Sequence, residues 1–299
     1  MIPSATGFGH GKVILLGEHA VVYGHPALAA GLSVGVRAHV SDGTGVLTAP
    51  GWELDRQIGD DSLPGQAVAR LCERFKVPKD SVDIWLETEI PARAGLGSSA
   101  AMATAIARAL EARTGQTVDL AESVSFAESI FHRTPSGIDS AASRHGGVGR
   151  FDKASGWHPL PVGTQVEICV GVSGEGHDTG ALVTGVSALC DAVPAARKVL
   201  ETMGELAKAG ERALAAGDLP TVGHLFNLAH GLLSAGGVST PTLETLVYTA
   251  RDAGALGAKL TGAGGGGAVI ALATGNGEAI VRKWRAKGYY GFSTVIEHD

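Results

Sequence analysis

The sequence predicts an α+β fold in two halves, with helices packed on one side of antiparallel sheets. One observation is the order of the segments: stretches with strand periodicity and stretches with helix periodicity come in blocks, without a regular βαβ alternation. A second is the cluster of Gly156, Pro159 and Pro161, which interrupts the pattern near the middle of the chain. We therefore expect an N-terminal domain over residues 1–155 and a C-terminal domain over residues 156–299.

The N-terminal half is expected to open with strands. Val13–Leu16 and Ser33–Val40 are short, rich in valine and leucine, and separated by glycines and a proline, which is typical of a β-hairpin. In Ser81–Glu89 apolar residues alternate with charged ones, so this segment predicts a half-buried strand that ends before Pro91.

Three helices are expected next. Ser98–Arg113 consists mainly of alanine, methionine, isoleucine and leucine, which predicts a helix buried over most of its surface and ended by Gly115. Asp119 and Glu122 have the spacing of a capping box, and they open a second helix over Leu120–Phe131. A loop and a short third helix complete this half, over Arg133–Gly137 and Ile138–Arg144.

The C-terminal half is expected to contain one strand, a long helical stretch and a closing strand–helix–strand unit. Val166–Val172 is apolar and rich in β-branched residues, which favours a buried strand. Ala181–Leu233 is rich in alanine and interrupted at Pro194, Gly217 and Pro220, so it predicts several helices. The remaining elements are a helix from Thr240 as N-cap and Pro241 to about Asp252, and the segments Gly267–Ala273, Glu278–Lys287 and Tyr289–Ile296.

Composition and charge exclude several classes of protein. Glycine makes up 44 of the 299 residues, but the chain has no G-X-Y period and only 18% of its residues are charged, which excludes a collagen-like and a disordered protein. With 24 basic and 30 acidic residues the net charge is −6, and no basic run is present. Nucleic acid is therefore not expected as a partner.

The cysteines and the apolar segments bear on location. Cys72, Cys169 and Cys190 are odd in number and form no CxxC pair, which predicts neither a disulfide framework nor a zinc site and fits a reducing cytoplasm. Val13–Leu16 is far too short for a signal peptide, and no segment approaches the roughly 18 apolar residues of a membrane span. We expect a cytoplasmic protein without a membrane partner.

Two glycine-rich segments, Gly95–Ala100 and Gly262–Gly267, match G-x-G-x-x-G/A. A Rossmann site also needs an acidic residue about 20 positions on that ends a second strand, whereas Asp119 caps a helix. Glycines before a helix let backbone N–H groups approach an anion, and Ser98 and Ser99 add hydroxyls suited to phosphate or Mg²⁺. On this pattern alone, a plain strand-to-helix turn remains an equal alternative.

Several charged residues lie beside apolar segments. Lys12 precedes the first strand, Glu18 and His19 follow it, Glu128 lies on a core-rich helix, and Asp139 follows a loop. Each of them alone is consistent with an edge, surface or capping residue. Together they suit a phosphoryl transferase, in which a carboxylate and a serine hydroxyl hold Mg²⁺ while a second carboxylate and a lysine meet the attacking hydroxyl.

Three segments resemble the motifs of the GHMP small-molecule kinases, in the family's order: Gly11–Gly24, Gly95–Ala101 and Lys259–Gly267. Within the family, GEHAVVYG at positions 17–24 and the segment His132–Asp139 are similar to the mevalonate kinase branch. The resemblance extends from Gly7 to Ala273. It implies two α+β domains with a nucleotide and a small alcohol meeting between them.

The resemblance also implies roles for individual residues. Asp139 takes the place of the catalytic aspartate, and Lys12 that of the lysine that lowers the pKa of the acceptor hydroxyl and steadies the phosphoryl group. Ser99 and Glu128 match the Mg²⁺ ligands. Positions that match the substrate site are Lys12, Glu18, His19, Asp139 and Thr179. Positions that match the phosphate loop are Ala94, Gly95, Leu96, Gly97, Ser98, Ser99 and Ala100, while Gly262–Gly267 forms a third loop against the first motif.

The activity implied is ATP- and Mg²⁺-dependent phosphorylation of the 5-hydroxyl of mevalonate, in the route to isoprenoids, by an enzyme whose relatives commonly form homodimers. Alternatives are a phosphomevalonate kinase, a mevalonate 3-kinase, or a sugar or homoserine kinase of the same fold. A non-catalytic metabolite sensor predicts loss of Lys12, Ser99, Glu128 or Asp139, and all four are present. His177 stands where many members of the branch carry an arginine facing the substrate carboxylate, which leaves Lys12 and His19 as cationic candidates.

Overall fold

The computed structural model describes residues 5–131, 136–176 and 178–296. Its residues form two compact units, and neither unit is continuous in the chain. The first comprises Met1–Lys12, Val34–Ala92 and Gly97–His145, and the second comprises Val13–Ser33, Arg93–Leu96 and Gly146–Asp299. The long strands β1 (Ala5–Leu16) and β2 (Ala27–Asp42) each contribute residues to both units.

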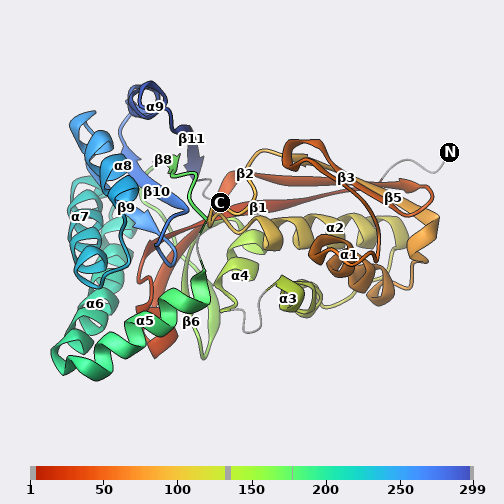
Figure 1. The fold of residues 1–299 in the computed structure, drawn as a ribbon, viewed down its shortest axis with the longest axis horizontal. Coiled ribbons are helices and arrows are strands. Elements are labelled where there is room, and N and C mark those ends of the chain that lie inside the picture. The colour runs from red at the N-terminus through yellow and green to blue at the C-terminus, as the bar shows by residue number, and fades with distance from the viewer. Residues whose placement is uncertain (1–4, 132–135, 177, 297–299) are drawn as a thin grey trace. The chain divides into compact units, whose positions relative to one another are not determined.

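The first unit has helices on one side of its strands, and α1, α2 and α3 lie together beneath β3 and β5 in Figure 1. The unit's own strands are β3 (Val46–Ala49), β4 (Leu54–Gln57) and β5 (Val82–Thr88). Its helices are α1 (Leu63–Arg74), α2 (Ser98–Thr114), α3 (Leu120–Phe131) and α4 (Ile138–His145). β5 pairs antiparallel with Val36–Asp42 of β2 and parallel with β3, which pairs antiparallel with β4.

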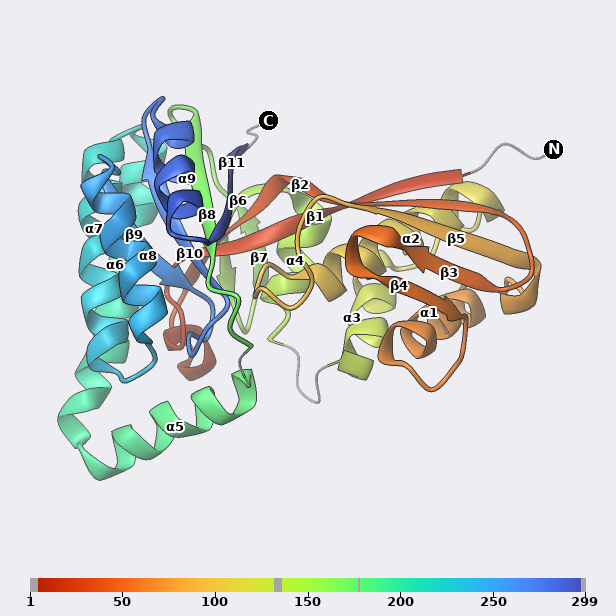
Figure 2. The same ribbon diagram turned by 45° about the horizontal axis from the view of Figure 1, so that its top comes forward.

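The second unit contains a four-stranded antiparallel sheet in the order β11-β8-β10-β9. These strands are β8 (Val166–Val172), β9 (Gly257–Thr261), β10 (Ala268–Ala273) and β11 (Tyr290–Ile296). Its helices are α5 (Thr179–Ala192), α6 (Arg197–Ala215), α7 (Leu219–Ala235), α8 (Pro241–Asp252) and α9 (Gly277–Ala286). Figure 2 shows α7, α8 and α9 beside this sheet, and α6 packs on α7. Ala27–Gly31 of β2 pairs antiparallel with β6 (Gly147–Asp152), which pairs antiparallel with β7 (Gly156–Pro159), and these strands continue the sheet order β4-β3-β5-β2-β6-β7.

Most of the predicted elements are confirmed, and their caps explain why. The N–H of Glu122 donates to Asp119 Oδ1 over 2.9 Å, and the N–H of Leu243 donates to Thr240 Oγ1 over 3.3 Å. Gly115, in the left-handed conformation, ends α2 as expected. The long alanine-rich stretch divides into α5, α6 and α7, with a 3₁₀ turn over Pro194–Ala196 between the first two. Arg133, Thr134 and Pro135 of the expected loop lie outside the described residues.

Glycines in β1 let this strand lie directly on α2. A Cβ atom on Gly9 would lie 2.1 Å from the carbonyl oxygen of Ala101, and one on Gly7 would lie 2.2 Å from that of Ala105. Two residues of a strand advance by about 6.8 Å, and four residues of a helix advance by about 6 Å. The two glycines therefore meet successive turns of α2, at Ala101 and Ala105, and the strand backbone contacts the helix backbone.

Gly9→Ala is expected to lower the free energy of unfolding by about 3 kcal/mol or more, because the added methyl group collides with a helix backbone that cannot move by itself. Urea denaturation measures this change. Gly231→Ala in α7 is the matched control, since nothing lies within 4 Å of a Cβ atom there. The control should be neutral or stabilising by about 0.5–1 kcal/mol. Equal effects of the two substitutions would contradict the proposed close packing.

Candidate active site

A lysine–aspartate pair forms the centre of the candidate site in the first unit. Lys12 Nζ lies 2.8 Å from Asp139 Oδ1, and the Lys12 side chain is only 4% exposed whereas that of Asp139 is 30% exposed. Asp139 is in the first turn of α4, and this helix is tied to β1 because Ser143 Oγ donates to the carbonyl oxygen of His10 over 2.7 Å. The pair leaves a partly exposed carboxylate beside a buried ammonium group, as the predicted roles require.

Gly97, the residue directly before α2, lies against this pair. Gly95 and Gly97 have φ values of +75° and +69°, which favour glycine. A Cβ atom on Gly97 would lie 3.2 Å from Lys12 Cβ and 3.9 Å from Asp139 Cβ, so a side chain here would crowd both residues. Gly97 is also the N-cap of α2 and supplies no capping side chain. The first N–H groups of the helix, with its positive dipole end, thus lie near the lysine–aspartate pair.

The other residues of the expected phosphate loop have distinct surroundings. Ser98 and Ser99 are half-buried in the first turn of α2. Ala94, Leu96 and Ala100 are almost completely buried. We infer that these three contribute backbone groups and packing rather than side-chain contacts to a ligand.

A buried carboxylate lies between two serines on neighbouring helices. Ser99 Oγ donates to Glu128 Oε1 over 2.7 Å, and Ser140 Oγ donates to Oε2 over 3.3 Å. Burial, together with the negative charge of Asp139, raises the pKa of Glu128 to about 7. The serine hydrogen bonds and Lys12 oppose this shift only in part. A further cation beside Glu128 would favour its ionised form.

The chemistry of this group fits Mg²⁺. A serine hydroxyl and a carboxylate are oxygen ligands, which Mg²⁺ prefers, and this ion usually takes only one or two carboxylates and completes its shell with phosphates and water. Within the described ranges no three His, Cys, Asp or Glu side chains converge to enclose a metal by themselves. Ser99 and Glu128 therefore suit an ion that arrives with a phosphorylated substrate.

In the second unit, the side chains of Glu18 and His19 contact residues in and just after β9. Glu18 forms an ion pair with Lys259, and both side chains are completely buried. His19 Nε2 lies 2.9 Å from the carbonyl oxygen of Ala263. A carbonyl oxygen can only accept, so Nε2 carries the proton and Nδ1 is left as an acceptor. Burial lowers the pKa of His19, so its ring is neutral near pH 7 and does not fill the expected cationic role.

The third glycine loop packs against the first motif, which confirms that part of the expectation. Thr261 Oγ1 accepts from the N–H of Ile14 over 2.8 Å, immediately before the loop. Within the loop, the N–H of Gly265 donates to the carbonyl oxygen of Val238 over 2.7 Å. A Cβ atom on Gly264 would lie 2.2 Å from the same oxygen. These contacts assign the loop a structural role in the second unit.

Thr179 begins α5 and is exposed, with Asp178 as the capping residue. His177, which replaces the expected arginine, and His132 of the fourth matching segment lie outside the described residues. The structure thus groups Lys12, Ser99, Glu128 and Asp139 within the first unit, and Glu18 and His19 within the second.

Sequence reasoning missed Ser140, Ser143 and Lys259 as supporting residues. Ser140 follows Asp139 directly, and its position beside a predicted catalytic residue was an available signal. Lys259 was also detectable, because it is the single charged residue in the apolar strand Gly257–Thr261. Its partner could not be identified, because Glu18 is 241 positions away in the chain.

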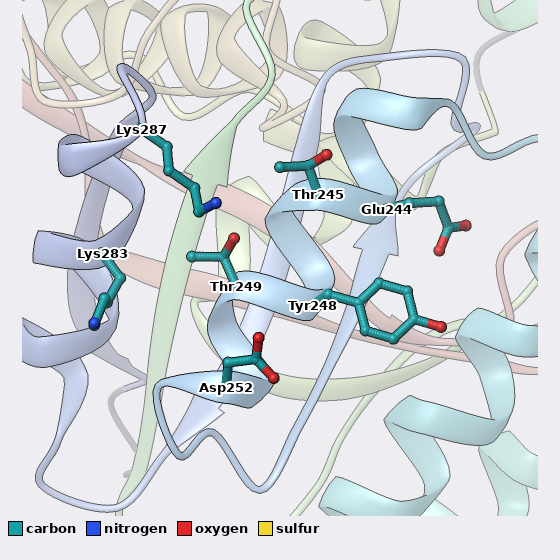
Figure 3. Close-up of a pocket in the computed structure, with 7 residues that line it drawn as sticks. All are labelled: Glu244, Thr245, Tyr248, Thr249, Asp252, Lys283 and Lys287. Carbon is teal, nitrogen blue, oxygen red and sulfur yellow. The ribbon is translucent and has the colours of Figure 1, made fainter.

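The described part of the second unit contains a small cavity and a larger hollow. The small cavity, of about 60 Å³, is lined by Glu18, His19 and apolar residues of α5, α6 and α7. The larger hollow, of about 420 Å³, lies over α8 and α9 (Figure 3). Its lining residues are Glu244, Thr245, Tyr248, Thr249, Asp252, Lys283 and Lys287. The larger hollow contains none of the predicted site residues, so it is separate from the candidate site.

Comparisons with known proteins assign the chain to a family. The model of the GHMP kinases N terminal domain matches residues 62–147, and that of the GHMP kinases C terminal domain matches residues 211–289. The chain belongs to the GHMP kinase family.

This GHMP kinase is similar to several archaeal proteins named mevalonate kinase. The one from Pyrococcus horikoshii is 36% identical, over 96% of this chain and 94% of the relative, and the one from Aeropyrum pernix is 36% identical over 88% and 86%. Among solved structures, L. major mevalonate kinase in complex with R-mevalonate is 28% identical with a TM-score of 0.86 and covers 98% of this chain and 97% of that one. The Methanococcus jannaschii mevalonate kinase, 21% identical with a TM-score of 0.84 over 99% of each chain, shares the fold.

Two further features of this GHMP kinase concern its thiols and its helices. Cys72, Cys169 and Cys190 are free and buried. In the part of the chain that the structure describes, no helix combines the length and apolar character that crossing a membrane requires.

Glu128→Gln is expected to stabilise the metal-free kinase at alkaline pH. Between pH 4.5 and about 7 the folded state keeps a proton on Glu128 that the unfolded state has released, so this carboxyl group lowers stability as pH rises. Glutamine removes that dependence. Denaturation in EDTA at pH 5 and pH 8.5 should show an advantage for the variant at the higher pH, on the order of 3 kcal/mol.

Glu205→Gln, at an exposed position of α6, is the control for this measurement, and its effect on stability should be small. A Glu128→Gln effect of equal size at the two pH values would contradict the raised pKa.

Proposed function

We propose that this GHMP kinase transfers the γ-phosphoryl group of ATP to the 5-hydroxyl of mevalonate, giving 5-phosphomevalonate and ADP in the mevalonate route to isoprenoids. The observation that carries the proposal is the pair of Lys12 and Asp139 beside the uncapped start of α2. The named relatives, 34–36% identical over most of their length, support mevalonate as the acceptor.

The reaction requires an acceptor hydroxyl group that is correctly oriented and that loses its proton. The hydroxyl oxygen forms a bond to the γ-phosphorus while the bond from that phosphorus to the bridging oxygen of ADP breaks, and the hydroxyl proton passes to Asp139. Lys12 stabilises the negative charge on the attacking oxygen and the transferring group. Because the transition state is loose, much of the contribution of Asp139 is orientation of the hydroxyl.

The start of α2 and its loop are suited to the phosphates of ATP. Backbone N–H groups at Ser98, Ser99 and Ala100 have no partner within the first helical turn, and they donate to phosphate oxygens. Ser99 and Glu128 would hold Mg²⁺. When bound, this ion supplies positive charge that offsets the charge on the β- and γ-phosphates.

His19 and Thr179 are proposed to bind the acceptor in the second unit. The neutral ring of His19 offers Nδ1 as a hydrogen-bond acceptor for a hydroxyl group. Thr179, exposed at the start of α5, offers a hydroxyl of its own. Glu18 was expected beside the substrate, but its carboxylate is buried against Lys259. We therefore treat its contribution as support for His19.

The proposed enzyme acts in the cytoplasm, whose reducing conditions suit its three free thiols. A homodimer, common among its relatives, is an additional expectation, and size-exclusion chromatography with light scattering measures it.

A panel of acceptors tests the proposed function. Purified kinase with ATP and Mg²⁺ is offered mevalonate, 5-phosphomevalonate, galactose and homoserine, and ADP release is followed in a coupled assay. We expect turnover with mevalonate and a product that ³¹P NMR identifies as phosphorylated at the 5-position. Omission of mevalonate gives the background rate.

The acceptor assignment would be wrong if millimolar mevalonate gave no ADP above this background, or if another acceptor were strongly preferred. Phosphorylation at the 3-hydroxyl would indicate the sister 3-kinase activity.

A further inference from the structure

Alternate residues around β9 hold the segment Ile14–His19 within the second unit. Lys259 Nζ donates to the Glu18 carboxylate, and Thr261 Oγ1 bonds both the N–H and the carbonyl oxygen of Ile14, over 2.8 and 3.0 Å. The carbonyl oxygen of Ala263 accepts from His19 over 2.9 Å. Since residues two apart in a strand point to the same side, Lys259 and Thr261 meet the same neighbouring segment.

The ammonium group of Lys259 uses all of its donors in these contacts. Its side chain is 0% exposed, and its ammonium group donates to the carbonyl oxygen of Leu260 over 2.8 Å and to that of Ile14 over 3.4 Å, besides Glu18. These three acceptors match the three donors of an ammonium group. Burial lowers the pKa of Lys259, and the charge of Glu18 opposes that shift. Either charge without the other would be buried and unpaired, so the two residues depend on each other.

The backbone next to Glu18 is strained. His19 has φ +57° and ψ −45°, an uncommon conformation for a residue with a side chain. Gly17 has φ +93°, and a Cβ atom there would lie 2.6 Å from the carbonyl oxygen of Pro26. Such conformations persist only where surrounding contacts hold them. At this turn the side-chain contacts are those of Glu18 with Lys259 and of His19 with Ala263. They add to backbone hydrogen bonds from the N–H of Ala20 to Glu18 and from that of Val21 to Gly17.

The side chain that this turn presents has an unused acceptor. His19 is 7% exposed, and its Nδ1 has no hydrogen-bond partner among the residues that the structure describes. The bond from Nε2 to Ala263 fixes both the tautomer and the direction of the ring. A buried acceptor nitrogen in a fixed direction suits a hydroxyl group of a bound ligand.

We propose that Lys259 is a positioning residue for the phosphoryl acceptor: by anchoring Glu18, it holds the strained turn that directs His19 Nδ1 toward an acceptor hydroxyl. The proposal rests on the proposed function above. It assigns Glu18 an indirect role, since its carboxylate binds Lys259 rather than the substrate.

The first test compares Lys259→Met with Leu272→Ala. Leu272 is a buried residue of β10 that pairs with Gly257 and Ile168, so its truncation destabilises the same sheet. We expect Lys259→Met to raise the KM for mevalonate about tenfold or more with little change in the KM for ATP. The control should lower the unfolding midpoint and leave both KM values unchanged.

The second test measures the protonation of the His19 ring directly by NMR, so it does not depend on catalytic activity. ¹⁵N NMR of the imidazoles, with His19→Gln to assign the signal, should show proton occupancy on Nε2 and a titration below that of an ordinary histidine in the parent protein. In Lys259→Met the His19 signal should shift toward mixed tautomers and an ordinary titration.

A double variant keeps the proposal testable if Lys259→Met fails to fold. Glu18→Gln combined with Lys259→Met leaves no unpaired buried charge, so it should regain most of the unfolding midpoint. We expect it still to show the raised KM for mevalonate and the altered His19 signal, because the anchor is missing. Unchanged KM and unchanged His19 signals in the double variant would overturn the proposal.

The two proposals fail in different ways. If the parent protein does not phosphorylate mevalonate, the proposed function fails, and the NMR comparison alone decides whether Lys259 positions His19. If the parent protein is active and the variants leave KM and the His19 signal unchanged, only the positioning role fails.

Discussion

The candidate site depends on how closely strand β1 approaches helix α2. Gly7 and Gly9 allow backbone contact with the turns at Ala105 and Ala101, and any side chain at these positions would separate strand from helix. Lys12 is the last residue of this strand that belongs to the first unit. Because Gly97 has no side chain, Lys12 can lie beside the start of α2. A small change in this approach would move the lysine relative to the helix N-terminus, and phosphoryl transfer is sensitive to such displacements.

The second unit uses a different means to fix its functional residues. A fully buried ion pair and two backbone-directed hydrogen bonds hold the turn that carries His19, although the turn itself is strained. Buried pairs of this kind contribute little net stability, but removing either charge alone leaves the other buried and unpaired. The first motif therefore serves both units: Lys12 belongs to the first, while Glu18 and His19 belong to the second.

The sequence predicted local structure well where local chemistry decides it. Asp119, Thr240 and Gly115 act through neighbours a few residues away, so their caps could be anticipated. The glycines of β1 could not be interpreted, because their partners lie about a hundred residues away in α2. The four site residues of the first unit could be predicted individually, and as a set through their motifs. The burial of Glu18 against Lys259 and the neutral state of His19 could not, because both follow only from tertiary contacts.

The most direct test of the account is a double-mutant cycle on the central pair, with kcat/KM for mevalonate as the readout. Lys12→Met and Asp139→Asn are each expected to lower this value by about 100-fold or more. Because the two side chains act as one unit at 2.8 Å, the double variant should be little worse than the more damaging single variant. An Asp139→Asn enzyme within a few-fold of the parent protein, or losses that simply multiply in the double variant, would contradict the account.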